Sequence, residues 1–310
     1  MKILLVADRP GWAYDILAQS IRVHSRYEDI DINYVSKMRL KINDYDFSNY
    51  DVVFFFLWYD AMRYGIQIKG FEFNKTCVGI HSLSSWSGRG LSTQQASLVC
   101  NQFAAAGYIS EEINQFLSLN SGFATPNGIE SSIFYPSELP STDELRLMWV
   151  GNPGHAHHGS NKGFHAIIKP VLNEFVEMGV SLVTATPDTP IAREHMGDFY
   201  RANHVLICAS LHEGGPMPII EALACGRPVI TTKVGIVSEI VENGRNGLIY
   251  ERSRSGLRSM IRKICDDRNL ISDLQKNTSQ SVNNRTAEDM AKSYDKMFEY
   301  VINISQGEYS

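Results

Sequence analysis

The sequence of 310 residues is poor in cysteine, in net charge and in long apolar runs. Its five cysteines form no Cys-x-x-Cys pair, and their odd number and mostly apolar neighbours indicate buried free thiols. This pattern excludes a disulfide scaffold and leads us to expect a protein of the reducing cytoplasm.

The charge balance gives no sign of a protein that binds nucleic acid or anionic membranes through its overall charge, and the hydropathy excludes a membrane-spanning protein. A net charge of −5 gives no general attraction to nucleic acid or to an anionic membrane. No stretch approaches the roughly 18 to 20 apolar residues of a membrane-spanning helix. We interpret the first apolar run, residues 2–7, as a buried strand rather than a signal peptide. We therefore expect a soluble cytoplasmic protein, with peripheral membrane attachment as an open alternative.

What the chain does contain is enough apolar material for two cores, at 44% hydrophobic residues. Short apolar runs alternate with helical patterns, which is typical of βαβ units and parallel sheets. The predicted fold class is therefore α/β, with two Rossmann-like α/β/α domains. Prolines cluster at 125–140, so we predict a first domain at 1–139 and a second at 140–287, followed by an amphipathic helix near 288–304.

The individual elements follow from the same patterns. We expect strands near residues 2–7, 32–35, 52–57, 76–80, 98–100 and 106–109, and then near 146–150, 181–185, 204–209, 228–231 and 248–250. We expect helices near residues 162–178, 216–225, 237–242 and 288–304.

Two glutamates, Glu213 and Glu221, flank a Gly-Gly turn and the start of an apolar helix. Glu221 has apolar neighbours on both sides, and a buried carboxylate requires a partner. A ribose diol, which donates two hydrogen bonds, is such a partner. Gly214, Gly215 and Pro216 leave the start of the helix accessible to a phosphate. The alternative is that Glu213 only caps the helix and Glu221 lies on its exposed face.

This stretch resembles the nucleotide-sugar site of the family 4 glycosyltransferases. The family pattern has an acidic residue, a glycine-rich turn, a proline and a second acidic residue opening E-A-x-A-x-G-x-P-V. The matching residues here are Glu213, Gly214, Gly215, Pro218, Glu221, Ala222, Ala224, Gly226, Pro228 and Val229, followed by Gly235, Glu239, Asn246 and Gly247. The resemblance implies the GT-B fold, in which two Rossmann-like domains face each other across a cleft and the last helix returns to the first domain.

The resemblance also implies roles for residues of the second domain. Glu213 would orient the hydroxyls of the transferred sugar, Glu221 would bind the ribose, and Lys162 would contact the diphosphate. The donor-binding set implied in this way is Gly214, Gly215, Pro216, Met217, Pro218, Glu221 and Asn152. Asn152 stands where the family usually has an arginine.

Three histidines in the loop before Lys162, at positions 155, 157 and 158, raise the question of a metal site. The loop contains no carboxylate or cysteine that would complete a ligand set, so we expect no metal. His155, His157 and His158 are then substrate contacts or part of a solvated loop.

In the first domain, His81 ends an apolar strand, and the carboxyl ends of parallel strands face the ligand crevice. The resemblance implies that His81 lies beside the transferred sugar, although a histidine at a strand end is more often structural. Gly11, Trp12 and Arg89 are the candidate acceptor-side residues, because aromatic faces and an arginine suit a sugar.

The resemblance thus implies a retaining, metal-independent glycosyltransferase that uses a nucleoside-diphosphate sugar and no cofactor, with an unidentified hydroxyl acceptor such as a glycan or a lipid-linked sugar. The rival interpretation is a non-catalytic sugar-nucleotide-binding protein or pseudoenzyme subunit. It is motivated by Asn152 and by the loop after the first strand, where Pro10-Gly11-Trp12 replaces the family's usual double glycine. An isomerase or phosphorylase is a third, weaker alternative.

Overall fold

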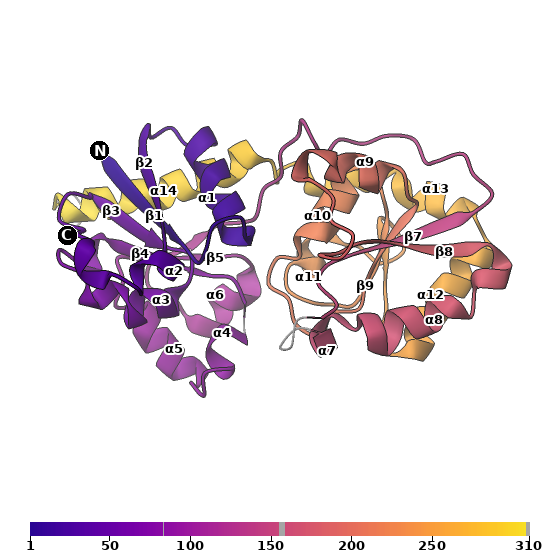
Figure 1. Cartoon of the computed structure of the whole chain (residues 1–310), viewed down its shortest axis with the longest axis horizontal. Helices are drawn as coiled ribbons and strands as arrows, with labels where there is room; N and C mark the ends of the chain where they lie inside the picture. Colours follow the sequence, from indigo (N-terminus) through magenta and orange to yellow (C-terminus); the bar gives the residue numbers. More distant parts are fainter. Residues whose placement is uncertain (83, 155–158, 308–310) are drawn as a thin grey trace. The chain divides into compact units, whose positions relative to one another are not determined.

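The computed structural model of the protein describes residues 1–82, 84–154 and 159–307. The chain divides into two compact units (Figure 1). Unit 1 comprises Met1–Gly128 with Ala287–Ser310, and unit 2 comprises Ile129–Thr286. Both contain a parallel sheet with helices, so the predicted pair of Rossmann-like α/β folds is confirmed.

Unit 1 has a six-stranded sheet in the order β2-β1-β3-β4-β5-β6, and every strand pair is parallel. Its strands are β1 (Lys2–Ala7), β2 (Asp29–Tyr34), β3 (Val52–Phe55), β4 (Thr76–Ile80), β5 (Ala105–Tyr108) and β6 (Gly122–Ala124). Its helices are α1 (Ala13–His24), α2 (Val35–Met38), α3 (Trp58–Arg63), α4 (Ser84–Ser87), α5 (Thr93–Cys100) and α6 (Glu111–Leu117), with 3-10 turns η1 (Ile42–Asp44), η2 (Gly65–Gln67) and η3 (Phe73–Lys75).

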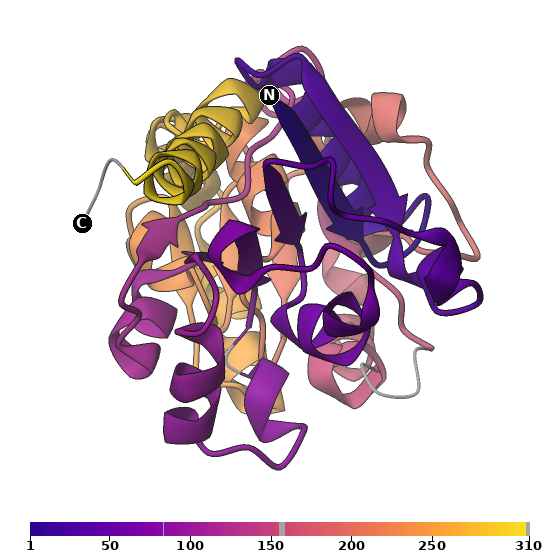
Figure 2. The same cartoon turned by 90° about the vertical axis from the view of Figure 1, so that its left-hand side faces the viewer.

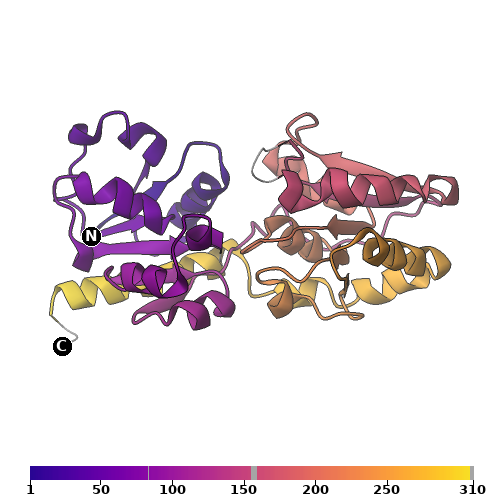
Figure 3. The same ribbon diagram turned by 90° about the horizontal axis from the view of Figure 1, so that it is seen from below.

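The terminal helix α14 (Ala287–Ser305) packs on the sheet of unit 1, as Figures 2 and 3 show in yellow. Tyr294 and Phe298 lie edge-on to Phe54 of β3, with ring centroids 5.3 and 6.1 Å away. The buried Asp295 of the same helix accepts a hydrogen bond from the amide of Arg26, at 3.0 Å. The apolar stripe read at 288–304 is therefore the face that docks on this sheet.

One predicted strand of unit 1 is wrong. Residues 98–100 form the last turn of helix α5 and not a strand. Ser92 and Gln95 form a capping box at the start of this helix, because each side chain bonds the backbone amide of the other. The Ser-x-x-Gln spacing at residues 92–95 indicates the start of a helix, and this signal is stronger than the short apolar run at 98–100 from which we predicted a strand.

Unit 2 has a five-stranded parallel sheet in the order β11-β10-β9-β7-β8. Its strands are β7 (Leu145–Val150), β8 (Val180–Ala185), β9 (Val205–Cys208), β10 (Val229–Thr231) and β11 (Gly247–Ile249). Its helices are α7 (Gly159–Lys162), α8 (Lys169–Asn173), α9 (Met196–Arg201), α10 (Met217–Ala224), α11 (Val237–Ile240), α12 (Arg254–Asp266) and α13 (Asn269–Gln275), with the π-helix η4 (Phe164–Ile168) and 3-10 turns η5 (Val176–Met178), η6 (Arg193–His195) and η7 (Ser279–Val282). None of the helices in the described ranges has the length and apolar character needed to cross a bilayer.

The helix predicted at 162–178 is a series of four short helical pieces instead. Gly163 has a φ of +65°, which interrupts the helix directly after Lys162. A Cβ at this position would lie 2.7 Å from the carbonyl oxygen of Ala209, so Gly163 also lets α7 approach the end of β9. The interruption therefore brings Lys162 to the loop that follows β9.

Residues 129–139, which the sequence prediction assigned to the first domain, pack within unit 2. Arg227 explains this, because its fully buried guanidinium donates to the carbonyl oxygens of Ser137 (2.9 Å) and Glu138 (2.8 Å) and to Ser137 Oγ (2.7 Å). It also donates to the carbonyls of Tyr200 and Arg201. These bonds tie the proline-containing segment to unit 2, so the division falls between Gly128 and Ile129 rather than after residue 139.

Candidate functional site

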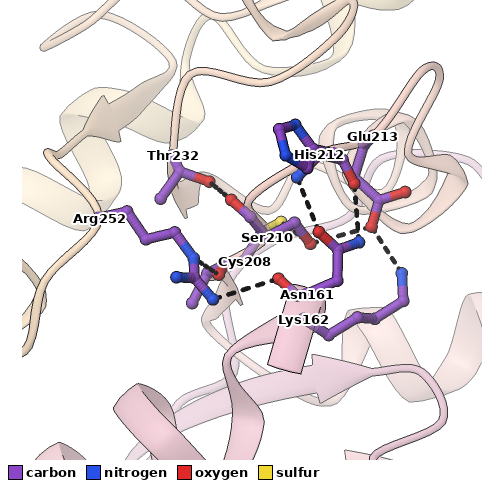
Figure 4. A network of polar contacts seen from close by, with 9 residues as sticks. Asn161, Lys162, Cys208, Ser210, His212, Glu213, Thr232 and Arg252 are labelled. Atoms are coloured by element: carbon purple, nitrogen blue, oxygen red, sulfur yellow. Dashed lines mark hydrogen bonds and ion pairs between the residues drawn. The ribbon is translucent and has the colours of Figure 1, made fainter. Parts of the chain in front are cut away.

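The candidate site of unit 2 lies at the carboxyl ends of β7 and β9. These strands are neighbours in the sheet, but the chain leaves β7 toward β8 on one side and reaches β10 from β9 on the other. Open parallel sheets bind ligands at such a point, where the connections turn to opposite sides. Figure 4 shows two of the residues that the sequence selected, Lys162 and Glu213, which follow these two strands, together with their polar neighbours.

Lys162 and Glu213, 51 positions apart in the chain, form an ion pair here. Lys162 Nζ donates to Glu213 Oε1 at 2.7 Å, and Ser210 Oγ donates to the same oxygen at 2.9 Å. The side chains of Lys162 and Glu213 are 27% and 19% exposed, so solvent screens the pair only in part. The site therefore holds an ammonium and a carboxylate side by side, each within reach of a ligand.

Two residues that the sequence reasoning missed fix this pair in place. The side chain of Asn161 bonds the backbone of His212 in both directions, each at 2.8 Å. Arg252 Nε donates to the carbonyl of Ala209 at 2.8 Å (Figure 4). These contacts join α7 to the loop that carries Ser210 and Glu213. Asn161 precedes Lys162 in the sequence, but nothing in the sequence indicates its role, because it bonds the backbone of His212 and not a side chain.

The Gly-Gly turn after Glu213 is held by a second loop. The amide of Ile236 donates to the carbonyl oxygen of Gly214 at 2.9 Å. We predicted that this helix starts at Pro216. In the structure α10 begins one residue later, at Met217, with Pro216 as its N-cap and Pro218 in its first turn. Among the described residues no side chain caps α10, which leaves its positive end to an anion.

A small pocket opens beside this helix start, lined by Lys162, Ser210, Glu213, Pro216 and Pro218 together with residues of β7 and β9. A wider hollow of about 440 Å³ lies against α11 and η7, and its lining includes none of the predicted site residues. The small pocket has the polar groups that a phosphate or sugar requires.

Glu221 is buried in α10, with 3% of its surface exposed. Its carboxylate has two protein partners that the sequence reasoning missed. Arg193 Nη1 donates to Oε1, and the Tyr200 hydroxyl donates to Oε2 at 2.7 Å. The burial expected from its apolar neighbours is observed, and the required partners are supplied by η6 and α9.

Asn152 does not join the Lys162 and Glu213 pair. Its Oδ1 accepts a hydrogen bond from the amide of Gly154 at 3.0 Å, so it closes a turn of its own loop, and it is exposed. His155, His157 and His158 lie outside the described residues. No group of three or more metal-ligating side chains occurs in the part of the chain that the structure describes.

In unit 1, contacts join the loops after β1, β3 and β4, and the first and last of these carry the acceptor-side candidates. The ring of Tyr14 lies 4.8 Å from that of His81, and Trp58 Nε1 donates to Ser85 Oγ at 3.1 Å. The Arg89 guanidinium stacks on the Tyr59 ring at 3.4 Å. The loops after β1, β3 and β4 therefore come together at one edge of the sheet.

Gly11 and Trp12 lie in the first of these loops. Gly11 has a φ of +74°, and its amide donates to Asp15 at 2.7 Å. Trp12 is 47% exposed and contacts the Arg9 guanidinium, which lies 4.0 Å from its ring. An exposed indole beside a cation offers a flat apolar surface on which a sugar ring can stack.

His81 has an apolar environment. Its ring packs against Tyr14 and Phe56, and burial lowers its pKa to about 4, so the imidazole is neutral at physiological pH. Its Nε2 atom is buried and has no hydrogen-bond partner among the described residues. His81 can therefore serve as a neutral hydrogen-bonding group but not as a cation.

Two carboxyl groups in unit 1 were missed. Asp8 follows β1 and Asp60 lies in the first turn of α3, after the neighbouring strand β3. Burial raises the pKa of Asp8, and burial raises the pKa of Asp60 to about 6, with the nearby Asp8 charge contributing to the latter. The only sequence signal was their position after two predicted strands, because their proximity follows from the strand order.

Comparisons with known proteins agree with this description of unit 2. Residues 189–281 match the family model described as glycosyl transferases group 1. A D-inositol 3-phosphate glycosyltransferase of Rhodococcus erythropolis is 36% identical over 114 residues, which are 36% of this chain and 23% of that protein. The matched segment thus spans less than a quarter of the length of this curated relative.

Solved structures resemble the chain over nearly its whole length. A sucrose-phosphate synthase from Thermosynechococcus elongatus aligns with 98% of this chain and 100% of its own, with a TM-score of 0.72 and 15% identity. Anabaena HepE in complex with UDP aligns with 96% of this chain and 100% of its own, with a TM-score of 0.67 and 15% identity. At this identity the likeness concerns the fold.

Proposed function

The chain belongs to the group 1 glycosyltransferases and has the GT-B fold, and from this premise we propose that it transfers a sugar from a nucleoside-diphosphate sugar to a hydroxyl acceptor. The donor binds at the end of the unit 2 sheet, and the acceptor binds at the joined loops of unit 1. The complex of HepE with UDP makes UDP the first nucleotide to test.

The observation that carries the proposal is the Lys162 and Glu213 pair next to the uncapped start of α10. Negative charge develops on the diphosphate as the bond to the sugar breaks. An ammonium and helix amides that are already in place stabilise this charge without reorganisation. Glu213 shares the ammonium and accepts hydrogen bonds from sugar hydroxyls.

We further propose that transfer retains the anomeric configuration and requires no metal. Retention is what the resemblance to the family 4 glycosyltransferases implies, with attack from the side on which the diphosphate leaves. The cationic groups named above take the role that a divalent ion has in other transferases. Activity that survives EDTA is the expected result, and its loss with rescue by a divalent ion would contradict metal independence.

The second candidate is a sugar-nucleotide-binding protein without catalysis. It is favoured by Asn152, which bonds Gly154 and contributes no charge where the family usually has an arginine. Both candidates predict donor binding, and only the first predicts turnover.

The experiment is a thermal-shift screen over nucleoside-diphosphate sugars, followed by an assay for release of the nucleoside diphosphate. A ligand that binds the folded protein raises its melting temperature. Binding with release supports the transferase, binding without release supports the second candidate, and no binding by any nucleotide sugar contradicts both.

A further inference from the structure

Glu221 poses a problem for ribose binding, because its carboxylate is buried and a protein donor already lies against each of its two oxygens. Oε1 accepts from Arg193 and Oε2 accepts from Tyr200, and the glutamate side chain is only 4% exposed. A ribose that approaches from solvent has to reach this carboxylate past one of its two partners.

The two partners differ in how easily they can leave. Tyr200 is fully buried in α9, and its ring also packs against Phe134 and Phe199. Arg193 belongs to the short turn η6, and its side chain is 33% exposed. Arg193 is therefore the outer partner, and Tyr200 is the inner one.

The position of Arg193 is supported by stacking rather than by burial. Its guanidinium lies 4.6 Å from the ring of Phe134, a cation–π contact that holds the side chain across Glu221. Such a contact contributes modestly at a partly exposed site, and an arginine side chain has many rotamers. The side chain can move away without disturbing the core below it.

We propose that the Arg193 guanidinium and the ribose of the donor compete for the Glu221 carboxylate, so that Arg193 sets how strongly the protein selects a ribose. This inference rests on the proposed function, because it assumes a nucleoside-diphosphate donor. When the donor binds, Arg193 leaves Oε1 and the ribose hydroxyls take its place, while Tyr200 keeps its bond to Oε2.

The competition predicts a specific effect of removing the guanidinium. The variant Arg193→Met keeps a long apolar side chain against Phe134 but leaves Glu221 without its cation. A buried carboxylate without that partner gains more from a diol than one that is already paired. The ribose should then contribute more to affinity than it does in the unmodified protein.

The experiment compares UDP, GDP and ADP with their 2′,3′-dideoxy forms by calorimetry. The dissociation constant of the dideoxy form divided by that of the ribonucleotide measures what the ribose hydroxyls contribute. We expect this ratio to rise about tenfold in Arg193→Met, because the affinity for the ribonucleotide increases and that for the dideoxy form does not. Arg193→Gln, which is also neutral, is a second variant and should change the ratio in the same direction; circular dichroism establishes that each variant is folded.

A ratio that stays the same or falls in both folded variants overturns the inference, since Arg193 would then support Glu221 rather than compete for it. The variant Glu221→Gln separates this result from failure of the proposed function. If it leaves the ratio of the unmodified protein unchanged, Glu221 does not bind the ribose and the inference fails, while release of nucleoside diphosphate from a donor still supports the transferase. If no nucleotide binds the unmodified protein, both fail.

Discussion

A Cβ atom at Gly235 would lie 1.9 Å from the carbonyl oxygen of Gly214, a distance that no side chain can occupy. Gly235 also has a φ of +49°, which side chains rarely adopt. The loop after β10 can therefore approach the Gly-Gly turn this closely only with a glycine at position 235. The hydrogen bond from Ile236 to Gly214 depends on this approach, and with it the position of Glu213.

We predict that Gly235→Ala lowers the free energy of unfolding by more than about 2 kcal/mol, because backbone must move in addition to the strain of a positive φ. Gly244→Ala is the matched control, since Gly244 has a φ of +83° and its Cβ would meet nothing within 4 Å. This control should cost only about 1 kcal/mol. Urea unfolding measures both, and equal losses would contradict the role of the close approach.

Lys162→Ala should reduce turnover about 100-fold and weaken binding of the nucleoside much less, because the ammonium acts on charge that develops at the diphosphate. Lys263→Ala, at an exposed position of α12, is the control and should leave turnover unchanged. Steady-state kinetics and nucleoside binding are the measurements. Equal losses of nucleoside affinity and turnover would assign Lys162 to binding alone.

Asp60 makes the stability of unit 1 depend on pH. Its pKa is about 6 in the folded protein, above the ordinary 3.8, so the folded state binds more protons than the unfolded state between these values. The contribution of Asp60 to the free energy of unfolding is therefore retained below about pH 4 and lost as the pH rises through 6. Two pKa units correspond to at most about 3 kcal/mol.

We predict that Asp60→Asn removes this loss, so that the variant gains stability relative to the unmodified protein between pH 4 and pH 7.5. Asp46→Asn provides the contrast, because Asp46 is exposed and its pKa is lowered by Lys69. It should show no such gain. Urea unfolding at the two pH values checks both variants. If the stability of Asp60→Asn differs from that of the unmodified protein by the same amount at both pH values, the buried carboxyl of Asp60 does not cause the pH dependence.

Arg89 tests the assignment of the acceptor to unit 1. Arg89 stacks on Tyr59 and donates to the carbonyl of Ser85 at 2.6 Å, so its loss should loosen two of the three joined loops. We expect Arg89→Ala, like Trp12→Ala, to reduce transfer to the acceptor at least several-fold while donor affinity stays within about twofold. Competition binding with the donor provides the comparison, and a matching fall in donor affinity would contradict the assignment.

Much of the fold could be predicted because apolar runs mark the strands of parallel sheets. Residues 2–7 and 76–80 coincide with β1 and β4, and the buried Glu221 followed from its neighbours. The helix at 162–178 was overextended because its apolar pattern continues through Gly163, whose φ and contact with Ala209 depend on the tertiary structure. The segment 129–139 was assigned by its prolines, whereas the buried Arg227 decides where it packs.

The candidate site was predictable only as far as single residues carry a chemical signal. Lys162 and Glu213 were selected separately, and the structure brings them to 2.7 Å. Arg193, Tyr200 and Asn161 escaped because an ordinary arginine, tyrosine or asparagine gains its role only from the partner that the fold supplies. The same holds for Asp8 and Asp60, which lie near each other because β1 and β3 are neighbours in the sheet.

The most direct test of the central claim is the affinity of UDP, GDP, ADP, CDP and dTDP for the unmodified protein and for Glu221→Ala, measured by calorimetry. We predict that at least one of them binds with one molecule per chain, and that Glu221→Ala weakens this binding at least tenfold in a folded protein, since a charge-assisted hydrogen bond contributes roughly 1.5 to 3 kcal/mol. Binding that Glu221→Ala leaves intact would contradict Glu221 as the ribose contact, and no binding at all would contradict a donor site at the carboxyl end of the unit 2 sheet.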